Sequence, residues 1–415
     1  MPAIPKNWWK PQNKKRRFAT QSVQKFHPPF RFAAKGGFFE KTLEILVYKC
    51  YNVLKASVSL ESLLLKEGIK MKAVQIVKPG ELRIIEMEKP VIDETNNVLI
   101  RMTAAGICGS DRGIYHGTNA AATYPRVIGH EMVGVVEEVG PGVSRVKPGD
   151  RVIVDQVTAC GTCYACRKGR PNVCGNLKVR GVHIDGGYRQ WMAVPENDCY
   201  LLPDHISDVD AVLIEPTTIA IQCCARAEIE AEDTVLIMGA GALGSRILSV
   251  VKLHHPAKII VADIDDAKLE AALKNGADAV IRSDREDVEQ RAKELTDGYG
   301  PTLCIDAACV KGSLLSLLQA AGNAGRVMTM GFSTSPDEIN QFVITSKELD
   351  VRGSRLQNRR FGEAVELVKN HAIDLSGEVS HTFSYLDAQA AFDFADNHAN
   401  EVRKIVLTFD TEESK

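Results

Sequence analysis

The sequence predicts an α/β protein in which an antiparallel β region precedes a region of alternating strands and helices. Residues 71–215 are rich in β-branched residues, Gly and Pro, and contain short strand-like runs. From about residue 230, apolar strands alternate with helices, which is typical of a parallel sheet with helices on both faces. The chain has 415 residues, 45% of them hydrophobic and 25% charged, which suits two or three domains.

We expect the elements in the following order. Alternation from Met71 onward predicts a β-hairpin, and short apolar runs predict strands at 98–100 and 151–154. The second region predicts strands at 233–238, 258–262, 279–281, 303–307 and 326–330, with helices at 242–253, 267–275, 286–295 and 313–321. The tail, 356–415, contains a helix at 361–369 and a last strand at 404–409, and we expect it to return to the first domain.

Charge is distributed unevenly along the chain. Residues 1–70 contain 14 Lys and Arg against 4 Asp and Glu, whereas the other 345 residues contain 37 against 49. Because the main body is acidic, we do not expect it to bind nucleic acid. No apolar run approaches the ~18–20 residues of a membrane span. Nucleic acid and membrane are therefore not expected as partners.

The first 70 residues differ in composition from the rest. Residues 1–39 contain nine Lys or Arg, no Asp or Glu, and several Trp and Phe. We expect native translation to begin at Met71, so that residues 1–70 are a disordered leader or a wrongly assigned start. The alternatives are an organelle transit peptide, which is also rich in basic residues, and a genuine additional module.

Four of the 11 cysteines stand within the sequence CGTCYACRKGRPNVC. Such clustering indicates a metal site in a reducing compartment, so we expect a cytoplasmic protein. Four thiolates close a tetrahedron around Zn²⁺ and leave no position for water, which makes this a structural site. An iron–sulfur cluster also takes four cysteines, but its typical spacings differ. The predicted ligands are Cys160, Cys163, Cys166 and Cys174.

A second constellation combines a thiol, an imidazole and carboxylates. Cys108 and Ser110 stand in AAGICGSD, and His130 and Glu131 follow in GHEMVGVVEEVG. Sulfur, nitrogen and oxygen ligands together suit Zn²⁺ with a free fourth position. Glu215 is a further candidate, either as a direct ligand or as the hydrogen-bond partner of the bound water. We expect a catalytic zinc here, because an open position lets the metal bind a substrate hydroxyl and lower its pKa.

The segment MGAGALG at 238–244 contains the pattern G-x-G-x-x-G. The pattern alone is weak, but here it follows an apolar strand, opens a helix and precedes Asp263 at the end of the next strand. Such glycines let the backbone approach a pyrophosphate at a helix N-terminus. A carboxylate at 263 would hold the adenosine ribose and repel a 2′-phosphate, which favours NAD over NADP. The predicted cofactor-binding residues are Gly239, Gly241, Leu243, Gly244 and Asp263.

In this order, the three constellations resemble the zinc-dependent medium-chain dehydrogenase/reductase family, over residues 71–409. GHE-x2-G-x5-G-x2-V, which begins at Gly129, is similar to the zinc signature of that family, and VKPGDRV at 146–152 fits as well. The resemblance implies a GroES-like β-barrel catalytic domain (71–217, completed by 356–415) with both zinc ions. It also implies a Rossmann domain (218–355), a doubly wound parallel sheet that binds NAD.

Finer features resemble the polyol and sugar-acid branch, because Glu131 follows His130 and Glu215 stands where alcohol dehydrogenases have a cysteine ligand. The segments GVHIDGGYRQWMAVP (181–195), IDAAC, MGFSTSP and GSRL resemble bacterial hexonate 5-dehydrogenases, which oxidise L-gulonate or L-galactonate. The resemblance implies that zinc held by Cys108, His130 and Glu131 binds the hydroxyl, and that hydride passes to NAD. It also implies that Ser110 starts a proton relay.

Some positions depart from the family or have no fixed role. Relatives often carry His five residues after the ligand cysteine, where this chain has Gly113, and His116 is a possible substitute. A guanidinium grips a carboxylate with two hydrogen bonds, so Arg112, Arg180 and Arg355 are candidates for sugar-acid binding. His183 either bonds the substrate or braces a turn. The isolated cysteines are expected to be buried apolar side chains, namely Cys199, Cys223, Cys224, Cys304 and Cys309.

The leading hypothesis is a zinc enzyme that transfers hydride from a secondary hydroxyl of a sugar acid or polyol to NAD, as a homo-oligomeric dimer or tetramer. Sorbitol-type polyol dehydrogenase and threonine dehydrogenase are the alternatives within the enzyme class, because they share the ligand set. The alternatives outside it are an NAD-sensing regulatory protein and a nucleic-acid or membrane adaptor that uses residues 1–70.

Overall fold

The computed structural model describes residues 69–332 and 336–409, which lie within one compact unit. Residues 1–68 of the predicted leader (1–70) lie outside the described residues, so the expectations for them stay predictions, whereas Lys70 already belongs to the first strand. Within the described ranges, no helix combines the length and apolarity that crossing a bilayer requires.

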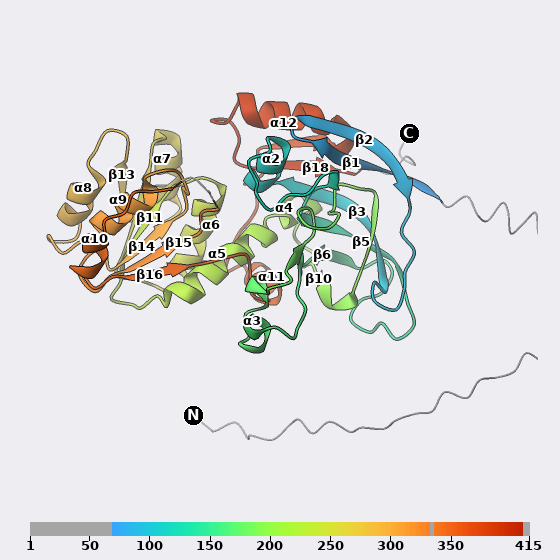
Figure 1. Cartoon of the computed structure of the whole chain (residues 1–415), viewed down its shortest axis with the longest axis horizontal. Helices are drawn as coiled ribbons and strands as arrows, with labels where there is room; N and C mark the ends of the chain where they lie inside the picture. The colour runs from blue at the N-terminus through green and yellow to red at the C-terminus, as the bar shows by residue number, and fades with distance from the viewer. Residues whose placement is uncertain (1–68, 333–335, 410–415) are drawn as a thin grey trace, which may run out of the picture. The chain divides into compact units, whose positions relative to one another are not determined.

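The first β region forms sheets around a shared buried core (Figure 1). One sheet has the strand order β2-β1-β4, and a larger one has the order β10-β6-β5-β3-β18-β17, with β9 also paired to β3. A short pair, β7-β8, completes the region. The elements up to residue 211 are β1 (Lys70–Lys78), β2 (Glu81–Glu88), β3 (Val98–Ile107), α2 (Gly109–Tyr115), β4 (Arg126–Val127), β5 (Glu131–Val139), β6 (Arg151–Val154), β7 (Val157–Thr158), α3 (Tyr164–Arg167), η1 (Pro171–Val173), β8 (Lys178–Val179), β9 (Trp191–Val194), η2 (Glu196–Asp198), β10 (Cys199–Leu201) and α4 (Asp208–Ala211).

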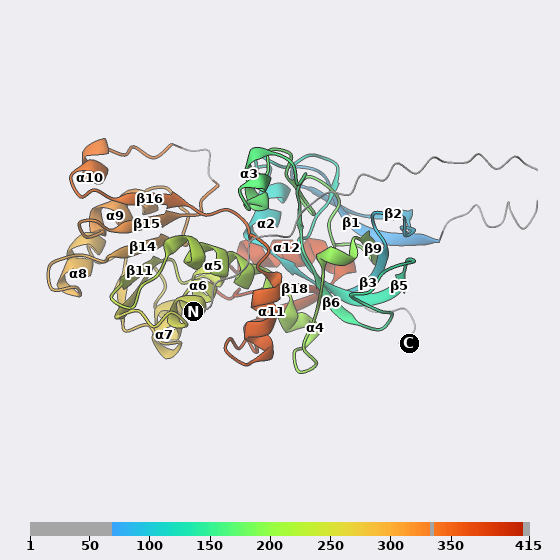
Figure 2. The same ribbon diagram turned by 90° about the horizontal axis from the view of Figure 1, so that it is seen from below.

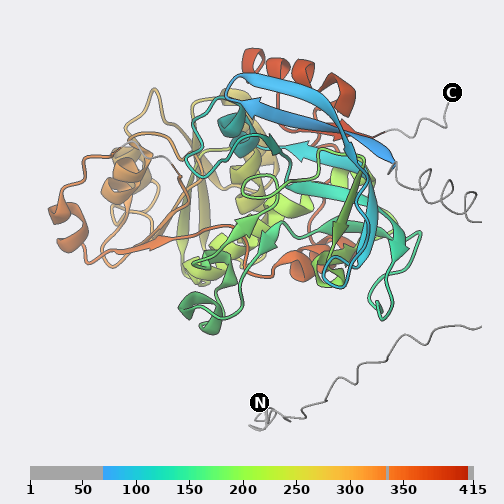
Figure 3. The ribbon, with the colours of Figure 1, turned by 45° about the vertical axis from the view of Figure 1, so that its right-hand side comes forward.

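The end of the chain joins the first β region. β18 (Ile405–Thr408) pairs antiparallel with β3, which places Ile405 opposite Ile107, and parallel with β17 (His381–Ser384). η3 (Tyr385–Asp387) and α12 (Ala388–Asn397) follow β17, and α12 buries Phe392 in the same core as Val74 of β1. Figures 1 and 3 show the red α12 beside the blue β1–β2 hairpin. The tail is therefore part of this region in space.

A parallel sheet follows, with the strand order β13-β12-β11-β14-β15-β16. The order reverses between β11 and β14, and ligands of such sheets bind beyond the carboxyl ends of the strands at this point. The predicted α/β architecture with a parallel sheet is confirmed. The elements are α5 (Ile214–Ala227), β11 (Thr234–Met238), α6 (Ala242–Lys252), β12 (Lys258–Asp263), α7 (Asp266–Lys274), β13 (Ala279–Arg282), α8 (Val288–Glu294), β14 (Leu303–Asp306), α9 (Ser313–Ala320), β15 (Arg326–Thr329), α10 (Gln341–Thr345), β16 (Asp350–Gly353) and α11 (Phe361–Lys369).

Helices cover both faces of the parallel sheet. Side chains of a strand alternate between its faces. Accordingly Val235 and Ile237 of β11 belong to a buried cluster with residues of α5, α6 and α7. Leu236 and Met238 belong to a second cluster with residues of α8 and α9. The continuous apolar run in β11 is thus explained by burial on both sides, as expected for a doubly wound sheet.

α5 is the largest element that the sequence analysis did not predict. Ten of its 14 residues are buried, so it lacks the polar face by which a surface helix is recognised. Its core cluster reaches from Val133 of β5 to Val235 of β11, and Figures 1 and 2 show α5 between the two sheets. The domain boundary expected between residues 217 and 218 falls within this helix.

We predict that Gly244→Ala destabilises the fold, because a Cβ there would lie 1.8 Å from the carbonyl oxygen of Gly239. Overpacking of this kind should lower the free energy of unfolding in urea by about 1–3 kcal/mol. Gly241→Ala is the matched control, since nothing lies within 4 Å of a Cβ at that position. Equal stability of the two variants would contradict the prediction.

Candidate active site and metal centres

The pairing of β3 with β5 brings together the residues of the second constellation. Cys108 directly follows β3, His130 directly precedes β5, and Glu131 is the first residue of β5. Because the two strands are antiparallel neighbours, the end of one lies beside the beginning of the other, with Gly106 opposite Glu131. One ligand atom from each of Cys108, His130 and Glu131 lies within 4.8 Å of the other two.

Gly106 makes room for the Glu131 carboxylate. A Cβ at residue 106 would lie 1.8 Å from Glu131 Oε2, so any larger side chain would displace the carboxylate. Glu131 is 1% exposed, and His130 is buried beside it. The three ligand candidates therefore converge at a buried place, which only a residue without a side chain at 106 permits.

The buried Asp111 contacts both Cys108 and His130. Its buried carboxylate accepts the backbone N–H of Cys108 at 2.9 Å and lies 3.4 Å from His130 Nδ1. Tyr188 donates to the same carboxylate at 3.4 Å and to the backbone oxygen of Gly106 at 2.9 Å. With Nδ1 facing Asp111, Nε2 is the ring nitrogen available to a metal, as in many carboxylate–histidine–metal arrangements.

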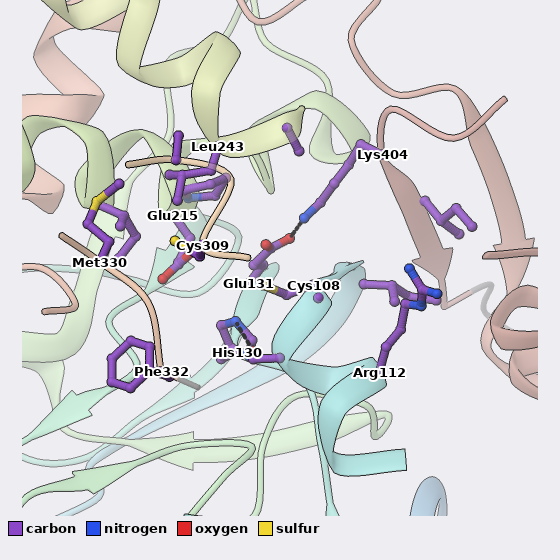
Figure 4. A pocket seen from close by; sticks show the side chains of 18 of the residues that line it. Cys108, Arg112, His130, Glu131, Glu215, Leu243, Cys309, Met330, Phe332 and Lys404 are labelled. Carbon is purple, nitrogen blue, oxygen red and sulfur yellow. Dashed lines mark hydrogen bonds and ion pairs between the residues drawn. The ribbon is translucent and has the colours of Figure 1, made fainter. Parts of the chain in front are cut away.

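Lys404 is a component of the site that the sequence analysis missed. It directly precedes β18, which pairs with β3, and its Nζ forms an ion pair with Glu131 Oε2 (Figure 4). Burial alone would lower the pKa of Lys404, but the facing Glu131 carboxylate raises it above its usual range. No motif surrounds this lysine, and only the return of the C-terminal strand places it here.

Glu215 and Ser110 lie at the edge of the cluster. The hydroxyl of Ser110 is 3.5 Å from His130 Nε2, and the buried Glu215 accepts a hydrogen bond from Gln156 Nε2. Burial raises the pKa of Glu215 to about 8, with His130 opposing this effect and Glu131 adding to it. Glu215 is not among the ligand atoms that lie within 4.8 Å of one another in the described residues.

A pocket of about 540 Å³ joins this cluster to the end of the parallel sheet. Cys108, His130, Glu131 and Glu215 line one side. The other side comes from α6, through Leu243, and from the segments that follow β14 and β15, through Ala307, Met330 and Phe332. In Figure 4, Met330 and Phe332 lie to the left of Cys108, His130 and Glu131. The volume is typical of small-molecule sites.

The cluster has the charge and the donor set that a divalent cation requires. Burial lowers the pKa of His130, while Asp111 and Cys108 raise it more, with a net increase well above its usual range. A buried place that stabilises positive charge to this degree also favours a metal ion. A thiolate, an imidazole and a carboxylate fit Zn²⁺, and the open pocket leaves a position for a further ligand.

The four clustered cysteines form a second candidate metal centre. Their ligand atoms lie within 4.8 Å of one another, and the sulfur–sulfur distances include 3.4 Å for Cys160–Cys174, 3.5 Å for Cys163–Cys166 and 3.8 Å for Cys163–Cys174. Sulfur atoms bound to one Zn²⁺ at ~2.3 Å would be ~3.8 Å apart at tetrahedral angles. Backbone N–H groups of Thr162 and Cys163 lower the pKa of Cys160 to about 6, whereas burial raises the pKa of Cys166 to about 12. The geometry fits a closed tetrathiolate site.

The glycine-rich loop occupies the point where the strand order reverses. Gly239 follows β11 with φ +97°, and Gly244 packs against its carbonyl. Gly241 caps α6 and has open space where a side chain would stand. Asp263, at the end of β12, accepts the backbone N–H of Ala240 at 2.6 Å. The predicted cofactor residues therefore come together, and Leu243, the second residue of α6, lines the pocket.

The other candidate residues for substrate binding and the proton relay differ in whether they line the pocket. Arg112 lines the pocket and binds Asp396, whereas Arg180 is buried against Asp198 and does not line it. His116 also binds Asp396, at 2.9 Å. His116 thus pairs with Asp396, and this contact gives no support to a proton relay from Ser110 through His116.

Arg355, His183 and Cys309 are the remaining residues that the sequence analysis singles out. Arg355 lies over the ring of Phe332, with its guanidinium carbon 5.7 Å from the ring centre. His183 accepts the backbone N–H of Val179, so it braces a turn. The expectation that all isolated cysteines are buried is wrong for Cys309, which is half-buried and lines the pocket because it lies in the loop after β14.

Comparison with known proteins identifies the relatives of this chain. Residues 94–204 match the family "Alcohol dehydrogenase GroES-like domain", and residues 242–370 match "Zinc-binding dehydrogenase". Starvation-sensing protein RspB of Escherichia coli is 40% identical over 340 residues, which are 82% of this chain and 99% of that protein. L-threonine 3-dehydrogenase of Pyrococcus horikoshii is 33% identical (81% and 98% covered), and sorbitol dehydrogenase of Bacillus subtilis is 30% identical (81% and 97%).

Solved structures agree with this placement. The crystal structure of RspB from E. coli CFT073 with NADH has a TM-score of 0.77 at 40% identity and covers 82% of this chain and 100% of that chain. A Sinorhizobium meliloti protein described as a candidate zinc-binding dehydrogenase, bound to NADP, has a TM-score of 0.74 at 29% identity, with 82% and 99% covered. The predicted GroES-like and Rossmann folds are confirmed. The chain belongs to the zinc-type, medium-chain alcohol dehydrogenase family, whose members are oxidoreductases that act on CH–OH donors.

Proposed function

We propose that this enzyme oxidises a secondary hydroxyl of a sugar acid or polyol with NAD, and that a hexonate such as L-gulonate or L-galactonate, oxidised at C5, is its substrate. One observation carries the proposal. Cys108, His130 and Glu131 face a pocket that also receives Leu243 from the glycine-rich loop. A metal-bound hydroxyl and a nicotinamide ring could therefore meet there.

Cys108, His130 and Glu131 would hold a catalytic zinc, and Cys160, Cys163, Cys166 and Cys174 a structural one. A catalytic zinc, when bound, stabilises the negative charge of an alkoxide near neutral pH. Asp111 fixes the orientation of His130 through Nδ1. Lys404 balances the charge of Glu131, so that the buried carboxylate is not left unpaired.

We infer that Glu215 and Ser110 handle the proton of the alcohol. Glu215 is buried in the pocket wall, and burial raises the pKa of its carboxyl to about 8, so that the carboxyl is mostly protonated at neutral pH and could exchange a proton with the alcohol. Ser110 lies beside His130 at the pocket surface and could pass a proton toward solvent. The apolar side chains of Leu243 and Met330 line the opposite side, which would keep water from the ring that accepts hydride.

Two cationic side chains favour an acidic substrate over a neutral one. Arg112 and Arg403 both line the pocket, and Arg112 directs Nε and Nη2 to a single oxygen of Asp396. This leaves other N–H groups of the guanidinium for a carboxylate. Threonine and sorbitol are the alternative substrates, because the relatives that act on them share the fold. Cytoplasmic localisation and a dimeric or tetrameric assembly stay predictions.

We predict two zinc ions per chain in the native enzyme, measured by elemental analysis after dialysis. Cys108→Ser and Cys166→Ser should each lose about one ion, because each removes a thiolate ligand from a different centre. Cys199→Ser is the control, since this buried thiol belongs to neither cluster, and it should retain both ions. Retention of two ions by Cys108→Ser would contradict the assignment of the catalytic centre.

The second prediction concerns the substrate. NADH formation followed over L-gulonate, L-galactonate, sorbitol, L-threonine and simple alcohols should show the highest kcat/KM for a hexonate. Arg112→Met should raise KM for the hexonate about tenfold or more through the loss of a charged hydrogen bond. It should change KM for sorbitol by less than about twofold.

Arg285→Met is the matched control for this measurement, because Arg285 also pairs with an aspartate, at 3.7 Å, but lies outside the pocket. A preference for sorbitol or threonine would overturn the sugar-acid assignment. Turnover of none of these compounds would favour a regulatory protein that binds NAD.

The third prediction concerns the choice between NAD and NADP. Asp263→Asn removes the negative charge at the end of β12 but keeps an acceptor for the backbone N–H of Ala240. The ratio of kcat/KM for NADP to that for NAD should rise about tenfold, because charge repulsion of ~1–2 kcal/mol with the 2′-phosphate is lost. Asp278→Asn, which supports the opposite end of β12 through Ile259 N, should leave the ratio unchanged. An unchanged ratio in both variants would contradict the role of Asp263.

A further inference from the structure

The cysteine lobe, residues 160–174, lies against a segment that forms part of the pocket wall. This wall segment, residues 354–358, follows β16 and contributes Ser354 and Leu356 to the pocket lining. Arg355, between them, covers the ring of Phe332, which also lines the pocket. The wall segment therefore forms part of the surface that lines the pocket.

Hydrogen bonds join the lobe and the wall segment in both directions. The buried amide of Asn172 in η1 donates to the backbone oxygen of Arg355 at 2.7 Å. Asn358 donates in turn to the backbone oxygen of Gly169 at 2.9 Å. The two contacts hold the wall segment near both of its ends, and each uses a side-chain amide against a backbone carbonyl.

The backbone between these contacts is strained. Leu356 has a φ of +48°, in the left-handed region that is unfavourable for residues other than glycine. Gln357 beside it is buried and donates to Asp155 Oδ1 at 2.7 Å. Strained conformations persist only where the surroundings determine them. If these contacts were lost, the Leu356 backbone would relax, and its side chain would change direction at the pocket surface.

Apart from Cys174, which belongs to the core of the first β region, no apolar side chain of the lobe is buried. α3 has four residues and η1 has three, and no residue of α3 is buried. The conformation of the lobe therefore depends on the cluster of four cysteine sulfur atoms. Asn172 stands two residues before Cys174, which is a member of this cluster. The position of the Asn172 amide is consequently set by the same cluster that would hold the structural metal ion.

We propose that the cysteine lobe positions the substrate pocket, with Asn172 as the residue that fixes the wall segment. Asn172 touches neither substrate nor cofactor in this arrangement and acts through Arg355 and Leu356. Loss of the contact would weaken alcohol binding and leave the dinucleotide site and the hydride-transfer geometry intact. The proposal rests on the proposed dehydrogenase function only for its kinetic readout.

The test compares Asn172→Ala with Asn176→Ala in the zinc-loaded full chain. Asn176 is the matched control, because it lies in the sequence just after the lobe but is exposed. Hydrogen–deuterium exchange of the peptide that covers residues 353–360 should be about five- to tenfold faster in Asn172→Ala, as expected for one lost hydrogen bond. KM for L-gulonate should rise by a similar factor. KM for NAD should stay unchanged, kcat should change by less than about twofold, and both zinc ions should be retained.

Asn358→Ala, which breaks the reciprocal contact to Gly169, gives an independent variant should Asn172→Ala lose zinc or fail to fold. Unchanged exchange of the 353–360 peptide in a folded, zinc-loaded variant would overturn the proposal, as would equal increases of KM for NAD and for the hexonate. If the wild-type enzyme oxidises no alcohol, the proposed function fails, and the exchange rates alone still decide the positioning role.

Discussion

The thiol of Cys108, the imidazole of His130 and the carboxylate of Glu131 converge because the ends of β3 and β5 are neighbours in one sheet. This convergence concentrates negative charge in a buried place, where it must be balanced. Lys404 supplies one positive charge, and a zinc ion would supply more. The glycine opposite Glu131, the buried Asp111 and the return of the C-terminal strand all serve this one cluster.

The pocket is complete only when distant parts of the sequence have assembled. Cys108 comes from the first β region, Glu215 from α5, Leu243 from α6 and Lys404 from the tail. The shared core of α5 couples the two sheets, so their relative placement sets the distance between the metal ligands and the glycine-rich loop. The resulting arrangement explains how one small pocket could join metal and dinucleotide chemistry.

Much of this arrangement could be predicted from the sequence, since motifs report local chemistry. Cysteine spacing, the Gly-His-Glu segment and the glycine-rich loop each carry their own ligands. The sequence could not reveal Lys404 or the strained Leu356, because their roles arise from long-range pairing and a backbone conformation. α5 escaped prediction because burial on nearly all sides removes its polar face.

The position of the catalytic metal is the central claim, and anomalous X-ray diffraction at the zinc absorption edge tests it most directly. Crystals of the native enzyme with NADH should show one peak among Cys108, His130 and Glu131, facing the nicotinamide, and a second among the four clustered cysteines. A peak at the four cysteines alone, with none at the first cluster, would contradict the account.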